Sequence, residues 1–287
     1  MAFLREKNGR WSPEKVAAFV VAVLPALWLF GRFVSHDLGA RPITEAIHFT
    51  GEWAVRLLLL SLLVSPARRI LGAGKLILAR RTLGVAAMAY ALLHLSLYIL
   101  DQKFNLFVVA SEIALRFYLT IGFVALVGLI ALGATSFDAV IRRMGPRWNT
   151  LHRLVYLVAV LAIVHFMLQK KIDIYEPTVM AGLTLWLFGY RLWQRMAGAA
   201  PGSIGLTALA CASALLTAAL EALWFGVRTG VDPWRVLEAN WALDIEIRPA
   251  WWVLAVTLAV VGVQCVANFR SSSRLPRQRM SISTARG

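Results

Sequence analysis

Two histidines lie deep inside strongly apolar stretches of the chain. His94 lies in the run Leu83–Leu100 and His165 in the run Leu151–Leu168. An ionisable side chain is costly in hydrocarbon, so an intramembrane histidine indicates a functional site. Two imidazoles at matched depth favour a metal held between helices, and an apolar pocket favours a b-type haem. The alternative is a pair of buried histidines that hydrogen-bond neighbouring helices.

The elements that position these histidines are membrane spans. The chain has 287 residues, 59% of them hydrophobic and 16% charged, with a mean hydropathy of +0.68. A transmembrane helix needs about 20 mostly apolar residues. We therefore predict an all-α, polytopic transmembrane helix bundle. Its eight spans are expected at about residues 16–34, 46–65, 83–100, 117–136, 151–168, 177–193, 204–225 and 250–268.

The stretch Gly198–Ser203 is the best internal boundary, because it interrupts the apolar pattern with Gly, Pro and Ser. It separates a six-span core, residues 16–196, from a two-span C-terminal extension, residues 197–268. A cytoplasmic N-terminal segment, residues 1–15, precedes the core. The basic, Ser-rich tail, residues 269–287, lacks apolar periodicity and is expected to be disordered.

The distribution of basic residues predicts the orientation of the spans. With the N-terminus inside, 20 Lys and Arg residues fall in the inner segments and nine in the outer ones. Cytoplasmic loops carry this excess, so we predict that both termini are cytoplasmic. The net charge of +15 is therefore explained by basic residues at the cytoplasmic membrane surface. We expect no nucleic-acid partner.

Depth along the helices separates two layers of candidate residues. His94 follows Arg81 by 13 positions and His165 follows His152 by 13, about 20 Å at roughly 1.5 Å per residue. The outer layer therefore offers two imidazoles, enough to ligate one haem, while the inner layer offers one. Because 13 residues turn about 220° on a helix, His152 and His165 need not face the same cavity. An interfacial structural role for His152 is the alternative to cofactor contact.

The second span places His48, Glu52 and Arg56 on one helical face, at positions i, i+4 and i+8. One interpretation is an ion pair between Glu52 and Arg56 that satisfies both side chains. The other is that Arg56 meets a haem propionate while His48 lies near the outer rim of the haem. His48 is also an alternative axial ligand.

Other residues carry weaker signals. Cys211 and Cys265 stand alone in apolar stretches, and they indicate neither a disulfide framework nor a metal-ligand pattern. Glu221 lies near the outer end of the seventh span, where we expect it to be solvated. The sequence shows no internal repeat and no dinucleotide fingerprint.

Several stretches of the first six spans resemble the MsrQ family, also called YedZ, within the wider ferric-reductase-like transmembrane group. The resemblance covers roughly residues 14–196, and its motifs recur in order and at matching spacing. These stretches are His48–Gly51, Arg80–Gly84, Leu92–Ser96, Arg116–Gly122 and Gly145–Ala159.

The resemblance implies a haem-binding subunit of the bacterial inner membrane that carries haem b and FMN. Such a subunit takes electrons from membrane quinones or from a cytosolic flavin reductase. It passes them to a periplasmic molybdenum-containing partner, MsrP, which reduces methionine sulfoxide in oxidised proteins. His94, His152 and His165 match the histidines of the family.

No short flavin motif carries over from the family. Arg81, with Arg80, Arg147 and Arg153, faces the cytoplasm, where these arginines are either positive-inside determinants or a phosphate-binding cluster for a flavin nucleotide.

The sequence is also compatible with three other functions. A stand-alone ferric or quinone-linked reductase would favour a flavoprotein domain, which this sequence does not contain. A proton-coupled transporter would use His94, His165, Glu52 and Arg56 as a polar path. A purely structural membrane anchor is the third possibility.

Overall fold

The computed structural model describes residues 10–171, 173–242 and 246–272 of the chain. Within these ranges all of the regular secondary structure is helical, which confirms the all-α prediction. The chain divides into two compact units. The first comprises Met1–Ser65 and Lys75–Met180, and the second comprises Pro66–Gly74 and Ala181–Gly287.

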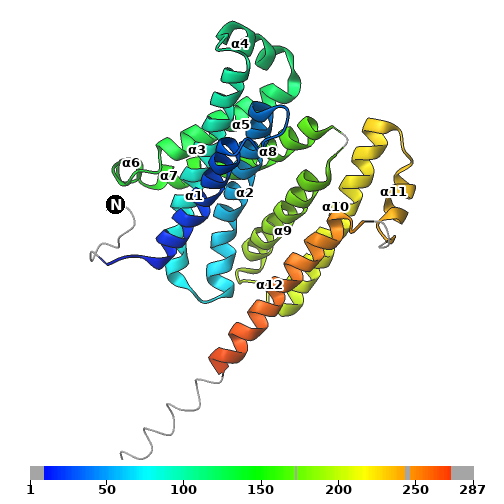
Figure 1. The fold of residues 1–287 in the computed structure, drawn as a ribbon. Coiled ribbons are helices and arrows are strands. Elements are labelled where there is room, and N and C mark those ends of the chain that lie inside the picture. The colour runs from blue at the N-terminus through cyan, green and yellow to red at the C-terminus, as the bar shows by residue number, and fades with distance from the viewer. Residues whose placement is uncertain (1–9, 172, 243–245, 273–287) are drawn as a thin grey trace, which may run out of the picture. The chain divides into compact units, whose positions relative to one another are not determined.

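The first unit contains the helices that carry the candidate histidines. Helix α5 packs against α8, while α3 packs against both α1 and α5 (Figure 1). The short helix α4 lies beyond the end of α3 and contacts α5. The helices are α1 (Pro13–Val34), α2 (Pro42–Ile70, up to Ser65), α3 (Ile77–Asp101), α4 (Leu106–Leu115), α5 (Phe117–Ala134), α6 (Asp138–Met144), α7 (Pro146–His152), α8 (Leu154–Lys170) and the start of α9 (Tyr175–Ala197).

Small residues and single hydrogen bonds fix this packing. Gly128 of α5 leaves room for Val158 of α8, so the two helices approach closely. The Tyr90 hydroxyl of α3 donates to the Ala22 carbonyl of α1 at 2.9 Å. After α5, the indole of Trp148 donates to the Thr135 carbonyl at 2.8 Å and holds α7 in place.

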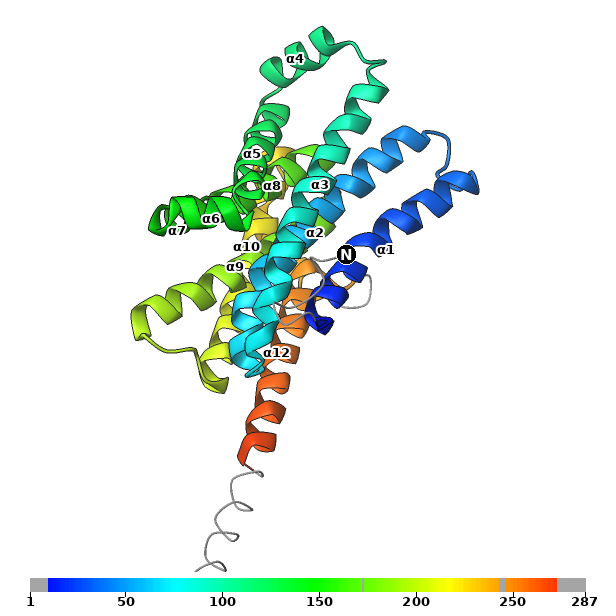
Figure 2. The same ribbon diagram turned by 90° about the vertical axis from the view of Figure 1, so that its left-hand side faces the viewer.

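In the second unit, the long helix α10 packs against α12 and against the short helix α11. It contains the rest of α9, α10 (Ser203–Thr229), α11 (Pro233–Ala239) and α12 (Pro249–Ser272). Helices α10 and α12 run alongside each other in both ribbon views (Figures 1 and 2). Gly182 of α9 contacts Thr217 of α10 and Val253 of α12, so a small residue again marks the closest approach.

Glu221 of α10 is not solvated, contrary to the sequence-based expectation. It is 3% exposed, and its carboxylate lies 3.2 Å from the guanidinium of Arg248. The amide of Asn240 also donates to it, at 3.4 Å. A buried carboxylate needs such partners, and Arg248 lies too far along the chain for helix periodicity to reveal it.

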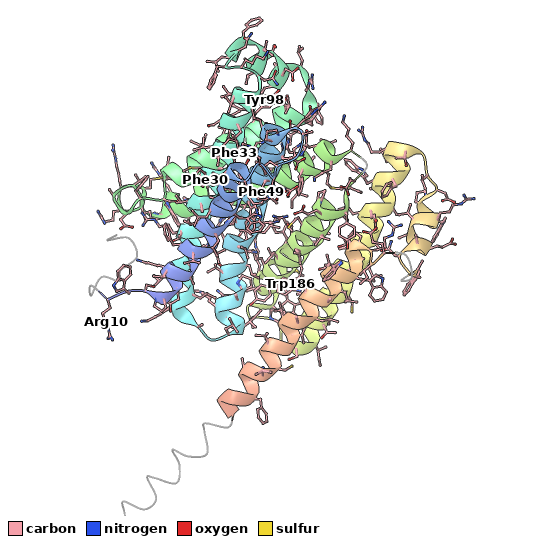
Figure 3. The ribbon with its side chains drawn as sticks, in the orientation of Figure 1. Arg10, Phe30, Phe33, Phe49, Tyr98 and Trp186 are labelled. Atoms are coloured by element: carbon pink, nitrogen blue, oxygen red, sulfur yellow. The ribbon has the colours of Figure 1, made fainter. Side chains whose placement is uncertain are left out.

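Seven helical segments in the described part of the chain are long and apolar enough to cross a membrane. They cover Pro13–Val34, Pro42–Ile70, Gly74–Asp101, Phe117–Ala134, Pro146–Lys170, Ser203–Thr229 and Pro249–Phe269. Large apolar side chains such as Phe30 and Phe33 of α1 are more than half exposed, and Figure 3 labels both. Extended apolar surface of this kind faces lipid, so the chain is a multi-pass membrane protein.

The count differs from the predicted eight spans at one place. Helix α9 occupies the position of the sixth predicted span, but it is not among the seven apolar segments. The short helices α4, α6, α7 and α11 were not predicted from the sequence. Most of the predicted N-terminal segment and basic tail, residues 1–9 and 273–287, lies outside the described residues.

Candidate functional site

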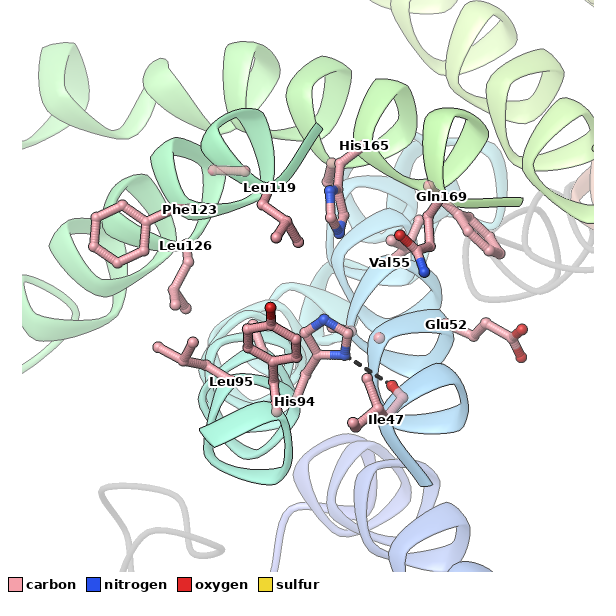
Figure 4. Close-up of a pocket in the computed structure, with 18 of the residues that line it drawn as sticks. Ile47, Glu52, Val55, His94, Leu95, Leu119, Phe123, Leu126, His165 and Gln169 are labelled. Carbon is pink, nitrogen blue, oxygen red and sulfur yellow. Dashed lines mark hydrogen bonds between the residues drawn. The ribbon is translucent and has the colours of Figure 1, made fainter. Parts of the chain in front are cut away.

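A cavity in the first unit opens among helices α2, α3, α5 and α8, with one residue of α4 (Figure 4). Aliphatic side chains such as Val55, Leu95, Leu119 and Leu126 form most of its wall. An apolar cavity with a few convergent polar groups is the usual form of a cofactor site. Its polar lining residues are His48, Glu52, His94, Tyr98, Tyr118, His165, Gln169 and Lys170.

His94 of α3 and His165 of α8 face each other across this cavity (Figure 4). Their ring centroids are 6.4 Å apart and their planes are inclined at 83°. His94 Nδ1 lies 2.8 Å from the Ile47 carbonyl oxygen, and His165 Nδ1 lies 2.7 Å from the Tyr118 carbonyl oxygen. A carbonyl only accepts, so each Nδ1 carries the proton and each Nε2 keeps a free lone pair.

This arrangement fits a haem iron with two axial imidazoles. A metal–nitrogen bond is about 2.0 Å long and an imidazole centroid lies about 1.1 Å from its nitrogen, so two imidazoles that held one metal between them would have centroids about 6.2 Å apart. The observed separation of 6.4 Å agrees with this value. The hydrogen bonds also fit, because a histidine that binds a metal commonly donates the N–H of its other ring nitrogen to a carbonyl or a carboxylate.

A chain of alternating charges borders the cavity. The Lys170 ammonium lies 3.0 Å from one oxygen of Glu52, and the Arg56 guanidinium lies 3.6 Å from the other. Arg56 also pairs with Glu176 at the start of α9 and lies over the Trp53 ring at 5.0 Å. The Glu52–Arg56 ion pair expected from the sequence is therefore present, within a larger network that the sequence did not reveal.

Of the other predicted residues, one lines this cavity and three do not. His48 lines its wall, but Arg56 does not, and Lys170 is the cation that does. His152 stacks on Trp148 with ring centroids 3.8 Å apart and is not a lining residue. Arg81 pairs with Asp138 at 2.6 Å, and both side chains are exposed.

Two glycines that line the cavity were not predicted as site residues from the sequence. Gly51 lies against the His94 ring and Gly122 against the His165 ring. A signal was available, because each glycine precedes its histidine by the same 43 positions. The equal spacing concerns these two pairs of residues, and the intervening residues show no repeat.

Comparison with known proteins agrees with the resemblance. Residues 50–163 match the family described as "Ferric reductase like transmembrane component". The Rhodospirillum rubrum protein is 42% identical over 203 residues, 69% of this chain and 95% of the relative. The Agrobacterium fabrum protein is 40% identical over 185 residues, 64% and 86%, and the Salmonella arizonae protein 40% over 188 residues, 63% and 94%.

All three relatives are named protein-methionine-sulfoxide reductase heme-binding subunit MsrQ. In each comparison about a third of this chain lies outside the match. No solved structure matches. The sequence identity and the coverage of these relatives show that the chain belongs to the MsrQ family, within the ferric-reductase-like transmembrane group.

Proposed function

We propose that this chain is the electron-transferring membrane subunit of a protein-methionine-sulfoxide reductase system, with haem b held between His94 and His165. The facing imidazoles at 6.4 Å, each with a free Nε2, are the observation that carries this proposal. A bound haem would supply a one-electron redox couple. The chain's own residues set the affinity and the potential of that couple.

Each group around the cavity has a defined task in this proposal. The two Nε2 atoms would bind the iron, and a pair of imidazole ligands would favour a low-spin, electron-transferring site, while the aliphatic wall excludes water. Lys170 is the cation that lines the cavity and would meet a propionate. Arg56 acts indirectly, because it holds Glu52 and Glu176. His48 lies at the cavity wall as a rim residue or an alternative ligand.

The direction of transfer follows from the proposed topology. His94 and His165 lie near the ends of α3 and α8, close to Asp101 and Lys170. With both termini in the cytoplasm of a bacterial inner membrane, these ends face the periplasm. Electrons from membrane quinones or a cytosolic flavin reductase would leave here to MsrP. FMN remains a prediction from the resemblance, with no residues assigned.

The decisive experiment is a dithionite-reduced minus oxidised absorption spectrum of the detergent-purified protein, with haem quantified per chain. We expect a low-spin b-type spectrum with about one haem per chain, and loss of this haem in His94→Ala and His165→Ala. His36→Asn is a matched control, because His36 is exposed and its positive φ of 54° suits asparagine. Full haem retention in both alanine variants would overturn the ligand assignment.

A further inference from the structure

Each candidate haem ligand lies directly against a glycine of a neighbouring helix. A Cβ atom on Gly51 of α2 would lie 2.9 Å from Nδ1 of His94 and 3.1 Å from its Cε1. A Cβ atom on Gly122 of α5 would lie 2.7 Å from both Nδ1 and Cε1 of His165. Such distances are below van der Waals contact, so any larger residue would displace the imidazole.

The hydrogen-bond acceptor of each histidine lies four residues before the glycine. Ile47 precedes Gly51 and Tyr118 precedes Gly122 by one helical turn. A helical side chain leans over the preceding turn, so a Cβ at either glycine would cover this carbonyl. The carbonyl oxygen has two lone pairs, and it accepts the histidine N–H in addition to its helical partner.

The same arrangement occurs twice. His165 follows His94 by 71 positions, and Gly122 follows Gly51 by the same 71. Both carbonyl-to-histidine hydrogen bonds span 47 positions. The pairs α2 with α3 and α5 with α8 therefore present one ligand each by the same combination of glycine, open carbonyl and imidazole.

We propose that Gly51 and Gly122 are positioning residues for the two haem ligands, because they keep the carbonyls of Ile47 and Tyr118 open to the histidine N–H. This inference rests on the proposed function. The hydrogen bond fixes the tautomer, aims Nε2 into the cavity and raises the basicity of the ligand. A more basic imidazole stabilises ferric iron, so the two glycines lower the reduction potential of the site.

The test measures haem affinity, midpoint potential and the electron paramagnetic resonance spectrum of Gly51→Ala and Gly122→Ala in the full chain. We expect haem to be lost to apomyoglobin about 10- to 100-fold faster and the midpoint potential to rise. Imidazole planes at 83° predict a low-spin signal with a large maximal g value in the parent protein. This value shifts when an added methyl group turns either ring.

Two controls separate histidine positioning from general packing damage. Gly128→Ala, also in α5, places its Cβ 2.5 Å from a methyl carbon of Val158 and touches no histidine. Gly84→Ala lies on α3 with nothing within 4 Å of its Cβ. If Gly51→Ala and Gly122→Ala shift the potential no more than Gly128→Ala does, the positioning role is wrong. A parent protein without haem would instead overturn the proposed function.

A second measurement applies even where the glycine variants do not fold. In His94→Ala supplied with added haem, imidazole can occupy the space of the lost ring and donate to the Ile47 carbonyl, whereas 1-methylimidazole lacks this N–H. We expect imidazole to restore the low-spin spectrum at about one tenth of the concentration that 1-methylimidazole requires. Equal concentrations would show that the carbonyl contributes nothing and would overturn the proposal.

Discussion

His152 and His165 lie on one membrane-spanning segment, yet their imidazoles have different surroundings. His165 faces the cavity with its Nδ1 on a carbonyl of α5, whereas His152 stacks on Trp148, four residues before it. The Trp148 ring therefore orients the His152 imidazole, which does not lie opposite a second histidine as His165 does. His152 ends α7 and His165 lies in α8, with Arg153 between the two helices, so this break contributes to their different surroundings.

His152→Ala is expected to retain the haem between His94 and His165. Loss of the aromatic contact with Trp148 should lower stability by about 1 kcal/mol, because such pairs contribute about 0.5–1.5 kcal/mol. The haem-to-chain ratio and the melting temperature in detergent measure the two effects separately. Complete loss of haem would contradict this assignment and make His152 a ligand.

The candidate ligands were predictable from the sequence because a histidine in an apolar run is rare and its depth can be counted. The Glu52–Arg56 pair was predictable because it lies within one helical turn. The acceptors Ile47 and Tyr118 were not, since they are backbone atoms that only tertiary packing brings to the histidines. Glu176, which also pairs with Arg56, lies 120 positions away in sequence.

At the scale of elements, the charge network joins α2 to the end of α8 and the start of α9. Glu52 is its centre, bound by Lys170 on one oxygen and Arg56 on the other. In Figure 4 its side chain is directed away from the two imidazoles. Its charge therefore acts on the cavity through space and through the lysine that it holds.

Glu52→Gln and Lys170→Met should shift the midpoint potential in opposite directions. Removing the carboxylate withdraws a negative charge that favours ferric iron, so the potential rises; removing the ammonium lowers it. Redox titration of the purified protein at low and moderate salt measures both shifts. Shifts of the same sign would show that the substitutions act through haem loss or unfolding instead.

In the second unit, the buried ion pair links α10 to the segment that enters α12. Among the described residues, Arg248→Met would leave the buried carboxylate of Glu221 with Asn240 as its one hydrogen-bond partner. We expect a destabilisation of about 1–3 kcal/mol, the cost of an unsatisfied buried group. Thermal unfolding in detergent measures it. Adding Glu221→Gln should recover part of the loss, and a double variant less stable than Arg248→Met alone would contradict the explanation.

Long elements were easier to predict than short ones. A hydropathy window finds helices of about 20 apolar residues, and each of the eight predicted spans overlaps a helix. The seven-residue helices α6 and α7 are too short for such a window, and α4 has only ten residues. Their ends depend on local capping and on contacts such as that of Trp148 with Thr135.

For the whole molecule, α9 determines the topology. If α9 crosses the membrane, the chain has eight spans and both termini face the cytoplasm; seven spans would place the termini on opposite sides. The basic residues in the C-terminal part of α9, Arg191 and Arg195, favour a crossing.

Reporter fusions test this topology directly. A fluorescent protein fused after Gly287 should mature in the cytoplasm, and alkaline phosphatase fused there should be inactive. Alkaline phosphatase inserted in the 172–174 connection should be active, because that connection is predicted to be periplasmic. An active phosphatase at the C-terminus would remove α9 from the set of spans.

The spacing of 71 positions between the two ligands also orders the biosynthesis of the protein. At about 5–20 residues per second, a ribosome completes His165 about 4 to 14 s after His94. During this interval α2 and α3 can already hold His94 on its carbonyl, but a ring opposite it does not yet exist. In the proposed function, haem capture would therefore follow the insertion of α8, and a chain truncated before that helix would lack the cofactor.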